Sequence, residues 1–131
     1  METINDVNNN RNIIIKQLNE YLLLDTDWDG YNGVPPDKQT IEDTIVFLKL
    51  LPNHIINPKI MLGNSGTVGL YWENDYNYIE VCFDGDTSYS YYCVNDKLEI
   101  GSNQVWLSDA PNEFNPIGNE MLSFFENFKG E

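Results

Sequence analysis

The chain has 131 residues, enough for one domain with a buried core that needs no disulfide or metal to hold it together. Its seven lysine and arginine residues face 21 aspartate and glutamate residues, so its formal net charge is -14 at pH 7. Nucleic-acid binding relies on clustered cations, and anionic membranes repel acidic proteins, so this charge argues against direct binding to either. An acidic surface instead favours solubility and steered encounter with a basic partner.

The sequence predicts a single domain over residues 1–131, located in the cytoplasm. No apolar run approaches the ~20 residues that a bilayer crossing needs, and the N-terminal stretch lacks the basic region and cleavage site of a secretory signal. Cys82 and Cys93 lie on the two strands of a predicted hairpin, out of register by roughly 10 Å at ~3.3 Å per residue. A disulfide needs Cα atoms within about 7 Å, so we predict two reduced thiols, as in cytosolic proteins.

Two helices are predicted first along the chain. Residues 6–24 carry apolar side chains at helical spacing, with Asp6 as the expected N-cap. Residues 38–51 carry a second apolar stripe, which Asp37 can cap and Pro52 ends. We therefore expect an N-terminal helical hairpin.

Beyond His54 the apolar pattern changes to period two, which is typical of strands. Residues 59–63, 67–73, 78–84 and 87–94 are predicted strands, and residues 97–101 and 104–108, with Gly101 between them, are weaker candidates. Residues 117–128 predict a last helix with one apolar face, formed by Met121, Phe124, Phe125 and Phe128. The predicted fold class is α+β: a helical hairpin, an antiparallel four- to five-stranded meander and a C-terminal helix.

The segment DTDWDG matches the first half of an EF-hand calcium loop. Asp25, Asp27 and Asp29 occupy ligand positions of that loop, and Gly30 occupies its turn position. Position 12 of the loop needs a bidentate glutamate, but here it is Pro36, which has no side-chain oxygen. We interpret the segment as a polar turn between two helices, with a divalent-ion site at the three aspartates as the alternative.

The same segment carries a resemblance. WDGYNGVPPD, the helix end FLKLLP and the strand GTVGLYWE together resemble a family of small uncharacterised bacterial and phage proteins over residues 28–83. That family shares a W-D-G-x-x-x-x-P-P turn and a strand ending in aliphatic-x-W-E, and its function is not assigned. The resemblance implies a compact α+β module from mobile or defence-related gene neighbourhoods, with no catalytic residues to carry over.

No catalytic or cofactor motif stands out. His54 is the single histidine and neither cysteine is near it in sequence, so a Cys-His nucleophile is not indicated. One histidine and two cysteines are also too few for a zinc site, and GNSGTVG lacks the lysine and helix of a phosphate loop. Glu73 and Glu80 could form an acid/base pair, but we interpret them as solvated surface. We predict a protein that is not an enzyme and has no cofactor.

Tyrosines concentrate on the predicted sheet, where side chains alternate between faces. Tyr91 and Tyr92 therefore cannot both point into one core. A second set of side chains should lie opposite the core face formed by Val68, Leu70, Trp72, Ile79, Val81 and Phe83, namely Tyr71, Glu73, Glu80 and Tyr92. Tyrosine with a carboxylate rim is typical of a protein-binding surface. The alternative is that the last helix or residues 104–107 cover this face.

We predict a non-enzymatic acidic binding protein that inhibits or escorts a basic protein partner. Its expected contacts are Tyr71, Glu73, Glu80, Asp84 and Tyr92. This class includes a phage-type inhibitor that mimics nucleic-acid phosphates to block a nucleic-acid-binding defence protein, and an antitoxin or immunity protein. The alternatives outside the class are a calcium-binding protein that uses the aspartate loop and, third, an enzyme with an acidic active site.

The calcium alternative can be tested by thermal unfolding. Because Pro36 removes the ligand that completes the coordination sphere, we expect the same melting temperature in calcium and in chelator. A calcium-dependent rise that Asp27→Asn abolishes would contradict the structural interpretation and establish the aspartate loop as a site.

Overall fold

The computed structural model describes residues 4–24, 30, 33–52, 54–63, 65–107 and 119–128. The elements in chain order are α1 (Ile4–Glu20), η1 (Tyr21–Leu23), α2 (Lys38–Leu50), β1 (Lys59–Leu62), β2 (Val68–Glu73), β3 (Asn77–Phe83), β4 (Ser88–Asn95), β5 (Glu99–Trp106), α3 (Asn119–Phe125) and η2 (Glu126–Phe128). The five strands form one antiparallel sheet in the order β1-β2-β3-β4-β5. The predicted α+β class, with its helical hairpin, meander and closing helix, is confirmed.

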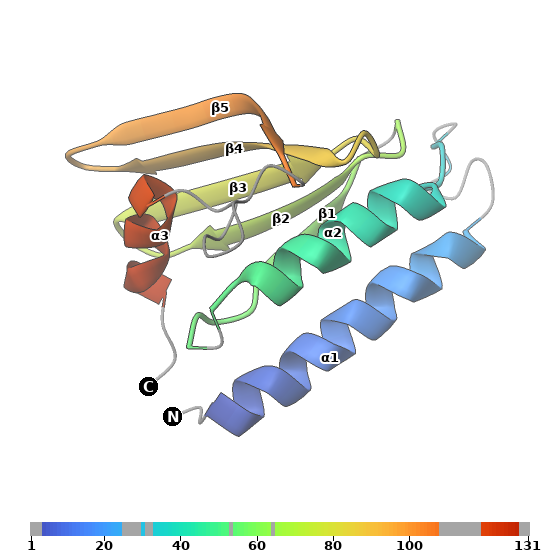
Figure 1. The fold of residues 1–131 in the computed structure, drawn as a ribbon, viewed down its shortest axis with the longest axis horizontal. Helices are drawn as coiled ribbons and strands as arrows, with labels where there is room; N and C mark the ends of the chain where they lie inside the picture. The colour runs from blue at the N-terminus through green and yellow to red at the C-terminus, as the bar shows by residue number, and fades with distance from the viewer. Residues whose placement is uncertain are drawn as a thin grey trace.

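The helices lie on one side of the sheet (Figure 1). α2 runs along that face, α1 packs antiparallel to α2, and α3 covers one end of the same face. The ring of Phe125 on α3 lies 4.8 Å from that of Trp72 on β2 and 6.4 Å from that of Phe47 on α2. One hydrophobic core therefore joins the sheet, α2 and α3, and Leu18 of α1 is buried with it.

α2 begins and ends as predicted. The carboxylate of Asp37 accepts a hydrogen bond from the backbone N–H of Thr40 at 2.8 Å, which satisfies a free donor of the first turn and lowers the pKa of Asp37. The helix ends at Leu50, before Pro52. Phe47 is fully buried in its last part, with ring centroids 5.7 Å from Phe83 and 5.0 Å from Tyr89.

Two predicted boundaries were wrong. α1 begins at Ile4, so Asp6 lies inside the helix and is not its N-cap. The predicted last helix agrees with α3 and the 3-10 turn η2 up to Phe128, and its first two residues, 117 and 118, lie outside the described residues. The two weak strand candidates form the single strand β5, and Gly101 lies within it rather than between two strands. A Cβ at this position would lie 3.0 Å from the carbonyl oxygen of Tyr91.

The pairing of β4 with β5 contains a β-bulge. Their register shifts between Tyr89 and Tyr91, since β5 passes from Val105 to Ser102 over the same interval and so carries an extra residue. A bulge bends and twists its strand locally. This irregularity let one continuous strand look like two short ones in the sequence pattern.

Arg11 attaches α1 to the loop that follows α2. Its side chain is 5% exposed and donates to the carbonyl oxygens of Leu51 at 3.0 Å, Pro52 at 3.3 Å and Ile55 at 2.7 Å, and to Oδ1 of Asn57 at 3.0 Å. Burial lowers the pKa of the guanidinium. Several neutral oxygens, rather than a carboxylate, therefore stabilise this buried cation among the described residues.

None of the helices in the described part of the chain is long and apolar enough to span a membrane.

Replacing Arg11 should destabilise the protein strongly. Arg11→Ala leaves the buried acceptors of the loop without a donor, and we expect the free energy of unfolding in urea to fall by about 3 kcal/mol. Arg11→Lys keeps the charge but cannot reach all the acceptors, so its loss should be smaller. The control is Lys16→Ala, an exposed position on the same helix, expected to stay within about 0.5 kcal/mol of the wild type. Equal losses for the Arg11 and Lys16 variants would contradict this role of Arg11.

Candidate partner-binding face

The register of the sheet brings four of the five predicted contact residues together. Tyr71 on β2 is paired with Glu80 on β3, and Glu80 is paired with Tyr92 on β4, so these side chains form a row across three strands. In the next row, Glu73 is paired with Tyr78. Paired residues of antiparallel strands share a face of the sheet. We call this surface the outer face; its members are Tyr71, Glu73, Tyr78, Glu80, Cys82, Ser90, Tyr92, Val94 and Glu99.

The alternate residues point into the core, as predicted. Val68, Leu70, Trp72, Ile79, Val81 and Phe83 are all at most 2% exposed. Tyr91 is paired with Val81 and its ring lies 6.2 Å from that of Tyr89, so it packs against the core side. Tyr92 points the other way and is 38% exposed. The prediction that Tyr91 and Tyr92 cannot share one core is confirmed.

The alternative that the last helix or residues 104–107 cover the outer face was wrong. α3 packs on the core side through Phe124, Phe125 and Phe128. The segment from Gln104 to Trp106 is part of β5, and Leu107 packs against the core. No helix in the described ranges lies over the outer face (Figure 1).

Two tyrosine hydroxyls hold carboxylates on this face. Oη of Tyr78 donates to Oε1 of Glu80 at 3.1 Å, and Oη of Tyr92 donates to Oε2 of Glu99 at 3.1 Å. Burial, the bond to Glu80 and the charges of Glu80 and Glu73 raise the pKa of Tyr78 to about 12. The bond to Glu99 raises the pKa of Tyr92. Both hydroxyls therefore remain protonated at neutral pH and keep donating to their carboxylates.

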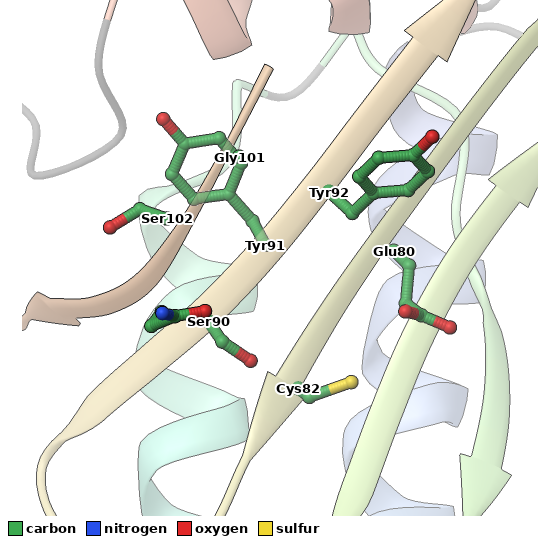
Figure 2. Close-up of a pocket in the computed structure, with 8 residues that line it drawn as sticks. Glu80, Cys82, Ser90, Tyr91, Tyr92, Gly101 and Ser102 are labelled. Atoms are coloured by element: carbon green, nitrogen blue, oxygen red, sulfur yellow. The ribbon is translucent and has the colours of Figure 1, made fainter. Parts of the chain in front are cut away.

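A hollow of about 370 Å³ opens beside Glu80 and Tyr92. It is lined by Glu80 and Cys82 from β3, Ser90, Tyr91 and Tyr92 from β4, and Gly101, Ser102 and Asn103 from β5. Figure 2 shows Glu80 next to Tyr92, with Cys82 and Ser90 farther along the same strands. Gly101, which is paired with Tyr92, has no side chain to fill this space. The hollow therefore combines a carboxylate, an aromatic ring and hydroxyl groups.

The thiols do not offer a nucleophile. Cys82 is paired with Ser90, as the hairpin prediction allowed, and burial and then the charges of Glu80 and Asp84 raise the pKa of its thiol. Cys93 lies on the core side, where burial raises its pKa to about 12. Both cysteines are free. A protonated thiol is a weak nucleophile, so neither is prepared for covalent chemistry.

His54 lies at another part of the molecule, 2.9 Å from Oε1 of Glu126 in the last turn of the described chain. Its Nε2 atom makes that contact, which joins the loop after α2 to η2. The sequence alone did not pair these residues, because they lie 72 positions apart. Both side chains are partly in solvent, so the contact lies at the surface, away from the outer face.

Asp84 is the predicted contact residue that the fold places elsewhere. It is exposed, directly after β3, and lines a separate hollow of about 310 Å³ with the start of α2 and the β1–β2 turn. Its neighbours there are Val34, Pro35, Asp37, Thr40, Ser65, Gly66 and Thr67. Sequence reasoning missed Tyr78 and Glu99 as members of the outer face. The alternation along β3 contained the signal for Tyr78, whereas Glu99 was hidden because its strand looked weak.

The three candidate metal ligands Asp25, Asp27 and Asp29 lie outside the described residues. Within the described ranges, no group of three or more His, Cys, Asp or Glu side chains is placed to hold a metal ion. The calcium alternative therefore stays a prediction that only the thermal measurement tests.

No protein-family model, curated protein or solved structure matches this chain. The resemblance to small bacterial and phage proteins stays a prediction.

The titration of Tyr78 tests the geometry of this face. Its folded pKa of about 12 lies above its ordinary value of about 10, so its contribution to stability is complete below pH 10 and is lost as the pH rises toward 12. Glu80→Gln removes the charge, and we expect the pKa of Tyr78 to fall but to stay above 10, because burial remains. Ring resonances followed by NMR against pH, assigned with Tyr78→Phe, measure this shift. An unchanged pKa in Glu80→Gln would show that the two groups do not interact.

Proposed function

We propose that this chain is a non-enzymatic acidic binding protein that inhibits or escorts a basic protein partner through its outer face. The observation that supports this most is the pairing of tyrosines with carboxylates, in adjacent rows, on a sheet surface that no described helix covers. In an antiparallel sheet with one buried face and one solvent-exposed face, the exposed face normally carries scattered polar residues. Aromatic side chains with a polar rim are instead what protein interfaces use.

The charge of the face supports a basic partner. Glu73, Glu80 and Glu99 lie on it, and two lysines lie at its margins, Lys59 on the edge strand β1 and Lys97 in the β4–β5 turn. The net charge of -14 adds a long-range field of the same sign. A basic partner would be attracted from a distance and would relieve the repulsion among these carboxylates on binding.

The tyrosines would act as anchors that are already ordered. Tyr78 and Tyr92 are each held by a hydroxyl bond to a carboxylate, and Tyr71 stands in the middle of β2 and is half-buried. Side chains fixed before binding lose little conformational freedom on association. Lysine and arginine groups can stack on tyrosine rings while they pair with the neighbouring carboxylates. Together these features favour a stable contact over a purely electrostatic encounter.

A role without catalysis fits the groups on the face. The thiol of Cys82 stays protonated, and His54, the histidine of the chain, contacts Glu126 in η2. Among the described residues of the outer face, neither the thiol of Cys82 nor the hydroxyl of Ser90 has a histidine beside it. The free thiols also support a reducing, cytoplasmic setting for the interaction.

Two finer versions of the function use the same face. A mimic of nucleic acid would occupy the phosphate-binding surface of a nucleic-acid-binding protein, and an antitoxin or immunity protein would cover a basic toxin. Duplex DNA should displace the chain from its partner in the first version. In the second version, DNA should leave the complex intact unless the toxin itself binds DNA.

The salt dependence and location of binding test the proposal. We expect a tagged protein to recover a basic partner from lysate of its native host at low salt and to lose it at high salt, because salt screens exposed charges. Glu73→Gln with Glu80→Gln should reduce recovery by about tenfold. The matched control, Glu20→Gln with Glu42→Gln, makes the same change in net charge on the exposed surfaces of α1 and α2.

Equal losses for the two pairs of substitutions would mean that net charge, not the outer face, drives recovery. The proposal would be contradicted if the partner were still recovered at high salt and by both doubly substituted variants. A partner that is itself acidic would do so as well.

A further inference from the structure

The hollow beside Glu80 and Tyr92 has features that select one kind of cation. We infer that it receives the guanidinium group of an arginine side chain presented by the partner. This inference rests on the proposed function, since it names the group that the outer face would recognise. Three features of the hollow support it: a positioned carboxylate, an aromatic wall and a polar lining.

The carboxylate of Glu80 is held in place before any partner arrives. Oη of Tyr78 donates to its Oε1 atom, and this is its hydrogen-bond partner within the described part of the chain. Because the pKa of Tyr78 is raised to about 12, that donor persists at neutral pH. Oε2 of Glu80 can then accept a charge-assisted bond from a guanidinium N–H, which is stronger than a bond between neutral groups.

The ring of Tyr92 forms the aromatic wall. It lies directly across β3 and β4 from Glu80, and its hydroxyl is bonded to Glu99, so the ring is fixed between two carboxylates. Gly101 leaves the ring uncovered on the β5 side: a Cβ at that position would lie 3.8 Å from Cδ1 of Tyr92. A planar guanidinium stacks on an aromatic face, whereas a lysine ammonium acts as a compact point charge.

The remaining lining consists of small polar groups. Ser90 and Asn103 are polar residues that line the hollow, and Ser102, whose hydroxyl donates to the carbonyl oxygen of Gln104, lines it as well. Asn103 belongs to the β-bulge, because β5 carries its extra residue between Ser102 and Val105, opposite the interval from Tyr89 to Tyr91. Arginine has five N–H donors in a fixed plane and lysine has three on one atom. An arginine can therefore reach the carboxylate of Glu80 and the hydroxyl of Ser90 together while its plane rests on Tyr92.

A comparison of two peptides tests this inference. Short oligo-arginine and oligo-lysine peptides of equal length carry equal charge, so they differ in the shape and donor pattern of the cation. We expect the arginine peptide to bind the wild-type protein about tenfold more tightly in calorimetric titrations at low salt. Tyr92→Leu should remove this preference and leave the weaker lysine binding nearly unchanged, because the carboxylates remain.

The control is Tyr76→Leu, which changes an exposed tyrosine in the β2–β3 turn, outside the hollow. It should keep the preference for arginine. Glu80→Gln should weaken the arginine peptide more than the lysine peptide. Tyr92 is partly exposed, so its substitution is compatible with folding, and the free energy of unfolding in urea verifies this for each variant.

The outcomes separate the inference from the proposed function. Binding of both peptides with equal affinity, or a preference that survives Tyr92→Leu, would overturn the arginine site and leave a basic partner possible. Binding of neither peptide would overturn both. A preference that is lost in Tyr92→Leu and kept in Tyr76→Leu would support both.

Discussion

The rest of the structure depends on the aromatic cluster around Phe47. Its ring meets those of Phe83 and Tyr89 from the sheet and that of Phe125 from α3, while Phe125 also meets Trp72. Such edge-on and tilted pairs bury large apolar areas with a defined geometry. This cluster fixes which face of the sheet is buried. Because side chains alternate along strands, it also decides that the tyrosine and glutamate rows point away from the helices.

On the outer face, hydrogen bonds from tyrosine hydroxyls hold carboxylates that would otherwise repel one another. Carboxylates on neighbouring strands repel one another, and a chain with net charge -14 has few cations to offset this. Tyrosine hydroxyls donate to these carboxylates in place of cations: Tyr78 donates to Glu80, and Tyr92 donates to Glu99. The chain's one arginine, Arg11, is not available to the face, because it is buried between α1 and the loop after α2. A cation from outside would therefore complete a surface whose acceptors are already in position.

The sequence predicted well wherever local physics and burial agree. The apolar stripe of α2, its Asp37 cap and the alternation along β2 and β3 were sufficient to place those elements and their faces. Prediction was poorer where a tertiary contact overrides the local pattern. Gly101 lies inside β5, where the neighbouring backbone leaves little room for a side chain, and a bulge interrupts the period of two. Asp84 was predicted as a partner contact because of its charge, but it follows the end of β3 and lies beside the start of α2.

By itself the sequence determined the fold class and the acidic character. It also placed two tyrosines and two glutamates, Tyr71, Tyr92, Glu73 and Glu80, on one face of the sheet. These results follow from composition and from the periods of helix and strand. Only the tertiary structure decided that α3 packs on the core side and that a hollow opens between Glu80, Tyr92 and Gly101. It also decided that Arg11 is buried and that hydroxyl bonds hold the carboxylates of the face. These features depend on contacts between residues far apart in the chain, and no local pattern encodes such contacts.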